Sequence, residues 1–358
     1  MGEFFQFLLK SRCCLVTALL VVGYTSVSLG KTEVPVFLLS GQSNMAGMQA
    51  LVSDLTADQK TTVDSVIIHM DAEGAANKRG KWMTLGPGFG STASNLGPEL
   101  FFGRTLADSM KTKIALIKDA VSGAPLGTAQ NGYLSPSSNN GTGGTLYKNM
   151  MNHIDAALKS FDTTNYTPRW AGFVWLQGET DAMNQSQANA YETNLTNLIK
   201  DIREKTKVED LPIILPMIDV QSTWTYNSIV RGADVACTQK LENVDTMDTK
   251  GLPTNGIHYK AQGHVTIGTV CAQRWLNMHF NYGAKVPVVY HYSPSSGIVL
   301  NPRAIGIPIV NIFDLSGRKF PAINGVADVA VKRPQGVIIV TTERRGELRG
   351  SKMISAGK

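Results

Sequence analysis

The sequence predicts an α/β protein with a mostly parallel, doubly wound sheet, followed by a small all-β module. From Glu33 onward, short apolar runs of strand length alternate with longer amphipathic segments of helical period. Beyond Ala284 the pattern changes to short alternating stretches divided by Gly, Pro and Asn. A length of 358 residues, with 43% hydrophobic and 17% charged residues, suits one large globular domain plus a smaller one.

Residues 1–30 have the pattern of a secretory signal peptide. Lys10 and Arg12 precede the apolar run Cys13–Val22, and small residues follow up to Gly30, where we expect cleavage. The alternative is an uncleaved membrane anchor, but the apolar run is short for a membrane span. We therefore expect a secreted or cell-surface protein whose mature form has no stable membrane span.

Two further features concern the exported chain. Its cysteines are Cys237 and Cys271, which would form either a disulfide or two buried free thiols. Residues 31–285 carry 22 basic and 23 acidic residues, whereas residues 286–358 carry 10 and 4. The net charge of +6 therefore belongs to the tail, which argues against a nucleic-acid partner for the main domain.

The first strand is Val36–Leu39, and the small polar turn Ser40–Asn44 follows it. Such a turn lifts a hydroxyl out of the sheet at the edge where α/β proteins bind ligands, so Ser43 is the candidate nucleophile. The alternative is that Ser43 and Asn44 only cap a helix.

The region up to Asn95 is irregular, with one expected strand at Ser65–Met70. Its glycine cluster, Gly86–Gly90, lacks a following Lys-Ser/Thr and is therefore no phosphate loop. Pro98 and Glu99 suit the first turn of a helix that continues to Met110.

The second buried strand, Ile114–Ile117, leads to Gly123. A glycine there lets the backbone point an N–H at a ligand, although a plain turn glycine looks the same. Residues 127–145 are predicted to form a surface loop, and Tyr147–Phe161 a helix.

The third strand, Trp170–Leu176, ends in Gln177, Glu179 and Asp181, and the helix Gln185–Thr206 follows. Two acids and a carboxamide at the end of a buried strand indicate function more than packing.

The fourth strand is Leu211–Ile218, where Pro216 suggests a bulge or an edge position. A helix from Tyr226 to Leu241 comes next. The polar turn Asn255–Tyr259 then places His258 on a loop before the last helix, Ala261–Phe280. The other histidines fit surface or satisfied core positions better: His69, His153, His264, His279 and His291.

These turns supply the groups that acyl transfer requires. Ser43 is the hydroxyl, His258 its base, and the N–H groups of Ser43 and Gly123 with the Gln177 amide are the oxyanion donors. A carboxylate, for which Glu179 is the preferred candidate, would orient the imidazole. No Cys/His cluster has the spacing of a metal site, so we expect neither a metal nor a cofactor.

Four blocks of this sequence resemble the SGNH hydrolases, and within them carbohydrate esterase family 6 and the sialate O-acetylesterase-like group. The likeness spans residues 34–280. The blocks are Gly41-Gln42-Ser43-Asn44-Met45, Asp119-Ala120-Val121-Ser122-Gly123, Trp175-Leu176-Gln177-Gly178-Glu179-Thr180-Asp181 and Asn255-Gly256-Ile257-His258.

The resemblance implies a flavodoxin-like three-layer fold and a serine esterase that removes acetyl groups from sugars. In a plant-wall setting the substrate would be acetylated xylan, which would make the protein an acetylxylan esterase. The alternatives are sialate O-acetylesterase activity and a catalytically silent carbohydrate-binding relative.

One position departs from the family pattern. The family usually has aspartate three residues before the histidine, whereas this chain has Asn255. Asparagine cannot stabilise an imidazolium by charge, so Glu179 is preferred as the acid, and Asn255 and Asp248 are the alternatives.

The tail, residues 286–358, resembles the C-terminal β-modules of bacterial secreted enzymes that direct secretion or surface attachment. Residues 309–318 and 334–340 carry this likeness. The sequence therefore predicts a signal peptide over 1–30, an esterase domain over 31–285 and a sorting or attachment module over 286–358, with a carbohydrate-binding or stabilising β-domain as the alternative for the module.

Overall fold

The computed structural model describes residues 31–127, 132–139 and 141–280, together with strands between residues 298 and 355. The predicted signal peptide, its cleavage near Gly30 and the domain boundary at 285/286 lie outside the described residues.

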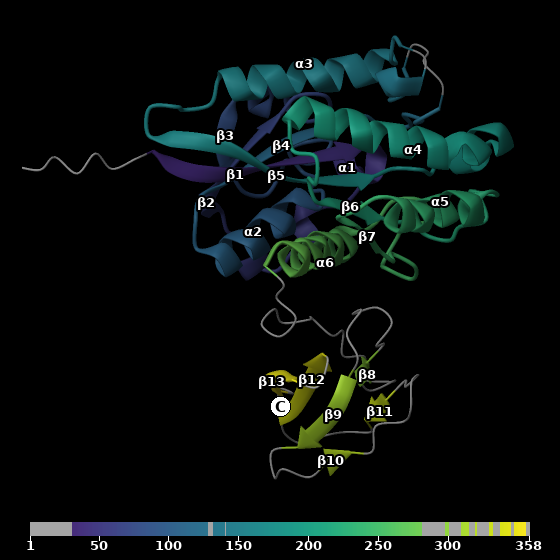
Figure 1. Ribbon diagram of the computed structural model, residues 1–358. Coiled ribbons are helices and arrows are strands. Elements are labelled where there is room, and N and C mark those ends of the chain that lie inside the picture. The colour runs from purple at the N-terminus through teal and green to yellow at the C-terminus, as the bar shows by residue number, and fades with distance from the viewer. Residues whose placement is uncertain are drawn as a thin grey trace, which may run out of the picture. The chain divides into compact units, whose positions relative to one another are not determined.

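The core of the main domain is a seven-stranded sheet with the order β3-β2-β4-β1-β5-β6-β7 (Figure 1). Only β3 runs antiparallel to its neighbour, and the other pairs are parallel. The strands are β1 (Thr32–Gly41), β2 (Val63–Met70), β3 (Trp82–Leu85), β4 (Ile114–Ala120), β5 (Tyr166–Leu176), β6 (Ile213–Pro216) and β7 (Val244–Met247). The predicted mostly parallel α/β sheet is therefore confirmed.

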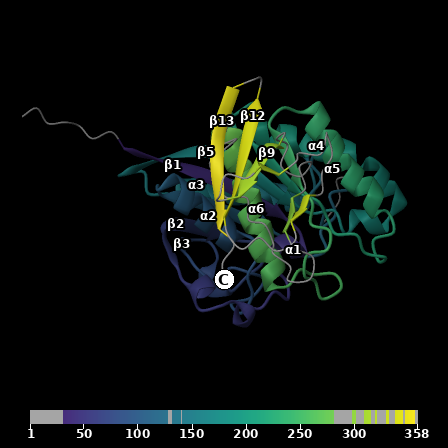
Figure 2. The same ribbon diagram turned by 90° about the horizontal axis from the view of Figure 1, so that it is seen from below.

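Helices cover both faces of the sheet. They are α1 (Ser43–Ala46), α2 (Glu99–Met110), α3 (Thr145–Lys159), α4 (Gln185–Thr206), α5 (Asn227–Lys240) and α6 (Ala261–Phe280). The apolar faces of α1, α2 and α6 pack into one core cluster, and those of α3, α4 and α5 into the other. Figure 2 shows α6 alongside α2, in agreement with their contacts. The result is the predicted three-layer arrangement.

Successive side chains of β1 point to opposite faces of the sheet, and both faces are covered, which explains its continuous apolar run. Val36 and Leu38 belong to the cluster under α3 and α4, whereas Phe37 and Leu39 belong to the cluster under α2 and α6. A strand buried on both faces cannot show the polar alternation of a half-exposed strand.

The register of the central strands brings the predicted functional turns to one edge. Ser40 of β1 pairs with Asp119 of β4, and Gly41 pairs with Leu176 of β5. The three turns that follow these parallel strands therefore leave the sheet at the same level.

Two strands, β3 and β7, escaped the sequence reading because each has only four residues with mixed burial. Pro216 is neither on an edge strand nor at a bulge: it is the last residue of β6, which lies between β5 and β7. Short 3₁₀ helices lie in the loops: η1 (Val52–Asp54), η2 (Asp58–Lys60), η3 (Ala76–Lys78), η4 (Ser137–Asn139) and η5 (Asp181–Met183).

Cys237 and Cys271 are free, buried thiols, which decides between the two predicted states. They lie in different core clusters, on opposite faces of the sheet. In the part of the chain that the structure describes, no helix combines the length and apolar character that crossing a membrane requires.

The C-terminal part of the chain contributes a four-stranded sheet, β10-β9-β12-β13, and a two-stranded sheet, β11-β8. Their strands are β8 (Ile298–Leu300), β9 (Ile309–Asp314), β10 (Lys319–Phe320), β11 (Val329–Val331), β12 (Val337–Arg344) and β13 (Glu347–Ser355).

Candidate active site

Ser43 lies on a turn that only glycine permits. Gly41 has φ +152°, and a Cβ at this position would lie 1.9 Å from the carbonyl oxygen of Leu176 on β5. The close approach of the two backbones lets β1 end at Gly41, one residue before Gln42 and Ser43, and Ser43 is the first residue of α1 and is 7% exposed. The N-cap of α1 is Gln42 and makes no side-chain capping bond, so helix capping does not explain Ser43.

Asn44, the next residue, connects Ser43 to the His258 loop. Its Oδ1 accepts the Tyr259 N–H at 3.1 Å, and its Nδ2 donates to the Ile257 carbonyl at 3.2 Å. Both neighbours of His258 are thus bonded to the residue that follows Ser43. The structure therefore brings Ser43 and His258 together across more than two hundred positions of sequence.

In the described part of the chain, the ring of His258 is hydrogen-bonded to an amide and to no carboxylate. His258 Nδ1 lies 3.2 Å from Gln49 Oε1, and Asn255 Nδ2 donates to the same oxygen at 2.6 Å. Asn255 Oδ1 accepts the His258 N–H at 3.1 Å. The imidazole is buried, and desolvation lowers the pKa of His258 below its usual value of 6.5.

Glu179, the predicted acid on the imidazole, is hydrogen-bonded to Asn44 and makes no hydrogen bond to His258 among the described residues. Its Oε1 accepts from Asn44 Nδ2 at 2.6 Å, and its buried Oε2 has no hydrogen-bond partner among the described residues. Burial raises the pKa of Glu179 from 4.5 to about 7. The carboxyl orients Asn44 and reaches the histidine loop only through it.

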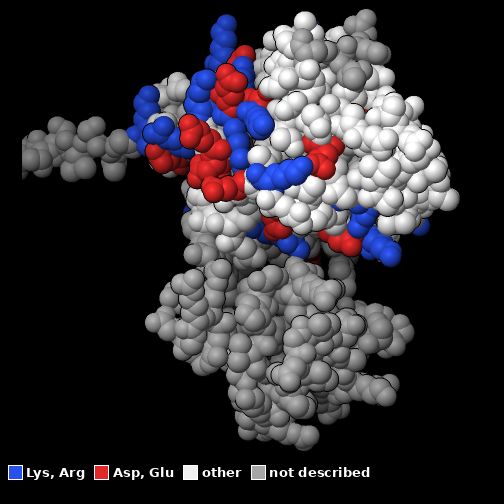
Figure 3. Space-filling model, turned by 45° about the vertical axis from the view of Figure 1, so that its right-hand side comes forward, with Lys and Arg blue, Asp and Glu red and all other residues white. Residues whose placement is uncertain are grey.

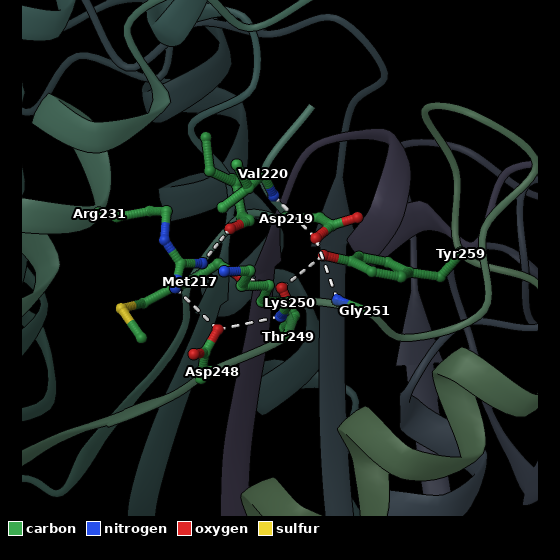
Figure 4. A network of polar contacts seen from close by, with 10 residues as sticks. Met217, Asp219, Val220, Arg231, Asp248, Thr249, Lys250, Gly251 and Tyr259 are labelled. Carbon is green, nitrogen blue, oxygen red and sulfur yellow. Dashed lines mark hydrogen bonds and ion pairs between the residues drawn. The ribbon is translucent and has the colours of Figure 1, made fainter. Parts of the chain in front are cut away.

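Asp248, the second alternative for the acid, is also directed elsewhere (Figure 4). Its Oδ1 accepts from Arg231 Nη2 at 2.7 Å and from the Lys250 N–H at 2.9 Å. In the same network the Tyr259 hydroxyl donates to Thr249 Oγ1 at 2.6 Å. Asp248 thus fixes the loop after β7, and the bond to Thr249 ties Tyr259, the residue after His258, to that loop.

Gly123 fits the predicted oxyanion position. It is exposed, has φ +71°, and its N–H has no partner among the hydrogen bonds of the described residues. The preceding residue is clamped, because the Glu73 carboxylate accepts both the N–H and the hydroxyl of Ser122 at 2.7 Å. Glu73 therefore fixes the turn that presents the Gly123 N–H.

Gln177, predicted as an oxyanion donor, has its amide nitrogen surrounded by acceptors of the domain itself. Its Nε2 faces Asp181 Oδ2 at 2.7 Å, the Ala124 carbonyl at 3.0 Å and Gln42 Oε1 at 3.1 Å, and an amide has only two hydrogens to give. Asp181 also accepts the N–H groups of Leu126 and of the residue after it. Gln177 and Asp181 therefore brace the turns after β4 and β5.

Gln42 is the amide beside Ser43 whose nitrogen has no partner among the described residues. Its Oε1 also lies 3.4 Å from the Gly178 N–H and 3.3 Å from the Thr180 N–H. Backbone N–H groups can only donate, so these contacts orient the oxygen inward and fix Nε2 on the other side.

The remaining histidines in the described segments are not arranged for catalysis or metal binding. His69 Nδ1 lies 2.8 Å from His153 Nε2, and His153 Nδ1 lies 2.8 Å from the Asp119 carboxylate, in a buried chain that links β2, α3 and β4. His264 is fully buried, and His279 stacks on Trp275. Over the described residues, no group of three or more His, Cys, Asp or Glu side chains could hold a metal ion.

The sequence reading missed Gln49 and the linking role of Asn44. Asn44 belongs to a quoted block, so its position was visible but its partners were not. Gln49 is an exposed loop residue with φ +64°. Glutamine rarely adopts this conformation, so nothing in the sequence predicts it.

The chain is similar to known carbohydrate esterases. The family model described as "Carbohydrate esterase, sialic acid-specific acetylesterase" matches residues 33–277, which include all four blocks. The chain is 27% identical over 253 residues to the probable carbohydrate esterase At4g34215 of Arabidopsis thaliana, covering 68% of this chain and 90% of that protein.

Solved structures share the fold. The Arabidopsis thaliana protein AT4G34215 has a TM-score of 0.54 at 23% identity, covering 69% of this chain and 98% of that chain. XAC1771, a carbohydrate acetylesterase from Xanthomonas citri, has a TM-score of 0.54 at 17% identity, covering 86% of this chain and 74% of that chain. NanS has a TM-score of 0.52 at 14% identity, covering 70% and 99%. With the family model spanning the whole sheet and its functional turns, the chain belongs to the carbohydrate esterase, sialic acid-specific acetylesterase family.

Proposed function

We propose that this protein is an exported serine esterase that removes O-acetyl groups from carbohydrates through an acetyl-enzyme. The observation that carries the proposal is the pair of Asn44 bonds that hold both neighbours of His258 beside the serine turn. The names of its relatives, a probable carbohydrate esterase and a carbohydrate acetylesterase, support the same substrate class.

In the first half of the reaction, Ser43 Oγ attacks the acetyl carbonyl carbon while the hydroxyl proton passes to His258 Nε2. The tetrahedral intermediate collapses, the sugar oxygen leaves with that proton, and acetyl-Ser43 remains. Water then attacks the acetyl group and gives its proton to His258. Acetic acid, which keeps the second hydrogen of the water, leaves as His258 returns its proton to Ser43 Oγ.

The N–H groups of Ser43 and Gly123 are the proposed oxyanion donors. The Gln42 amide nitrogen takes the place that the sequence reading gave to Gln177, since its oxygen is fixed by the turn after β5. Each such donor contributes roughly 2.7–4 kcal/mol to transition-state stabilisation in comparable sites.

We further propose a neutral, polysaccharide-type substrate such as acetylated xylan. Figure 3 brings forward the right-hand side of Figure 1, toward which α1 lies, and much of this side is white, that is, without Lys, Arg, Asp or Glu. Arg231, a cation near the loops of this edge, is already bonded to Asp248 and to the Ile218 carbonyl. A sialic acid carboxylate would need a cation that is not already paired in this way.

The test is acetate release by Ser43→Ala and His258→Ala, with Ser53→Ala as the control. We expect both catalytic variants to lose at least 10³-fold in kcat on an aryl acetate while their melting temperatures stay near that of the unmutated protein. Ser53 is an exposed serine whose hydroxyl bonds to its neighbour Asp54 and whose carbonyl, which the variant keeps, accepts from Lys60, so its variant should keep full activity. A Ser43→Ala protein with more than a tenth of the normal kcat would overturn the proposal.

The substrate is decided by NMR of acetate release from acetylated xylan and from O-acetyl sialic acid. Faster turnover of xylan supports the neutral substrate, whereas faster turnover of the sialate supports the alternative activity. Sugar binding without release of acetate from either would identify a silent carbohydrate-binding relative.

A further inference from the structure

The donors and acceptors around His258 can be assigned from the backbone outward. The His258 N–H can only donate, so the Asn255 atom 3.1 Å from it is the amide oxygen. The other end of the Asn255 amide is then its NH₂ group, which can only donate. This assignment follows from the hydrogen-bond network and needs no observed hydrogen position.

The same logic extends to Gln49 and the ring. Asn255 Nδ2 donates across 2.6 Å, so the Gln49 atom that receives it is Oε1. That oxygen also lies 3.2 Å from His258 Nδ1. Because two acceptors cannot bond each other, Nδ1 carries a hydrogen. In the neutral ring Nε2 is then unprotonated and is the nitrogen able to take a proton.

We propose that Gln49 is the positioning residue of His258, a neutral amide oxygen in the place where a Ser-His-acid triad has a carboxylate. The proposal rests on the proposed serine esterase function. It also accounts for Asn255, whose amide turns the Gln49 oxygen toward the ring. A carboxylate at position 255 would instead face the Gln49 oxygen with an oxygen of its own.

Backbone conformation supports a functional role for Gln49. Its φ of +64° is left-handed, which is unfavourable for a residue with a long side chain. Gln49 is also exposed, so burial does not stabilise the strained conformation. Strain of this kind persists where the surrounding structure requires a particular side-chain position, most often at functional sites.

The charges around the ring agree with a neutral partner. Glu179, from the turn after β5, is bonded to Asn44, and Asp248, from the loop after β7, is bonded to Arg231. Lys118 of β4 is paired with Glu99 of α2. On α6, His264 is neutral because burial lowers its pKa to about 3. The loss of solvation on burial is what lowers the pKa of His258.

The experiment compares two variants of nearly equal shape. Gln49→Met keeps the length of the side chain but cannot accept a strong hydrogen bond, and we expect kcat to fall about 10- to 100-fold with KM within about threefold. Gln49→Glu keeps an acceptor and adds a charge that favours the imidazolium. Since the unprotonated ring is the base, the acid limb of the kcat/KM profile should move to higher pH, by about one unit.

Gln262→Glu is the matched control. This exposed residue of α6 bonds to Gln59 and the Asp54 carbonyl, so the variant adds the same charge outside the hydrogen bonds of His258. Its pH profile should be that of the unmutated protein.

A second measurement does not depend on activity. In Ser43→Ala protein with ¹⁵N-labelled histidine, the Nδ1–H tautomer of His258 should dominate when Gln49 is present, and Gln49→Met should mix the two tautomers. The proposal fails if Gln49→Met retains normal kcat, if Gln49→Glu does not shift the acid limb of the pH profile, or if the tautomer ratio of His258 is the same with Gln49 and with Met at position 49. An active Ser43→Ala protein would instead overturn the esterase function itself.

Discussion

Glu179 is a buried carboxyl whose ionisation falls near neutral pH. Its folded pKa of about 7 lies above the ordinary 4.5, so the folded protein holds this proton more tightly than the unfolded chain. The contribution to stability is therefore highest below about pH 4.5, is lost as the pH rises, and is fully lost above about pH 7.

We predict that Glu179→Gln keeps kcat within about tenfold, because an amide oxygen can still accept from Asn44 and no contact with His258 is lost. The melting temperature of the variant relative to the unmutated protein should rise between pH 5 and pH 8, by an amount equivalent to roughly 1–3 kcal/mol. Thermal unfolding at several pH values measures it. A loss near 10⁴-fold in kcat, as for removal of a triad carboxylate, would restore Glu179 as the acid.

Single residues also show where the sequence reading reached its limit. Ser43 and His258 could be predicted because an apolar run marks where a strand ends and a polar turn marks a loop. The partner of the histidine could not, since Gln49 is far away in sequence and acts through a side-chain oxygen. Gln177 and Glu179 were placed on the correct turn, but hydrogen bonds within that turn, invisible in the sequence, decided their roles.

At the scale of elements, a buried ion pair joins the helix that carries Ser43 to the rest of the domain. Lys118 Nζ of β4 lies 2.8 Å from Glu99 Oε2 at the start of α2, 2.7 Å from the Phe89 carbonyl and 3.4 Å from the carbonyl of Ala46, the last residue of α1. Lys118 is 3% exposed and Glu99 0%.

We predict that Lys118→Met lowers the free energy of unfolding by about 3–5 kcal/mol, because it removes the cation from the buried Glu99 carboxyl and leaves it, among the described residues, the Gly97 N–H as its hydrogen-bond donor. Adding Glu99→Gln should recover part of that loss. The control is Arg169→Met, which removes an ion pair with Glu33 whose two side chains are 63% and 65% exposed, and should cost less than about 1 kcal/mol. Urea unfolding checks the ranking, and equal costs for the two single variants would contradict it.

The elements themselves were predictable in proportion to their burial. Strands β1, β4 and β5 have long apolar runs because both faces of the sheet are covered. β3 and β7 have four residues each, lie at the two ends of the sheet and are only partly buried, so neither has an apolar run that predicts a strand. Pro216 was misread because a proline at the last position of a strand does not interrupt the pairs before it.

At the scale of the whole molecule, the catalytic groups and both core clusters lie between residues 34 and 276. We predict that a chain ending at Lys285 keeps its kcat/KM on an aryl acetate within about twofold. Acetate release and thermal unfolding of the shortened chain measure it. A shortened protein that does not fold would show that the tail completes the catalytic domain, and the proposal of a separate attachment module would be withdrawn.

A buried histidine with an uncharged partner has a consequence for an enzyme that acts on densely acetylated material. Every deacetylation produces acetic acid, which is almost fully ionised at neutral pH. The released protons acidify a confined medium such as the inside of a hydrated fibre. A histidine bonded to a carboxylate has a higher pKa, so it would become protonated while the pH is still relatively high, and the reaction would stop. Burial lowers the pKa of His258, and the neutral Gln49 oxygen does nothing to raise it again, so the enzyme would go on working in the acid it makes.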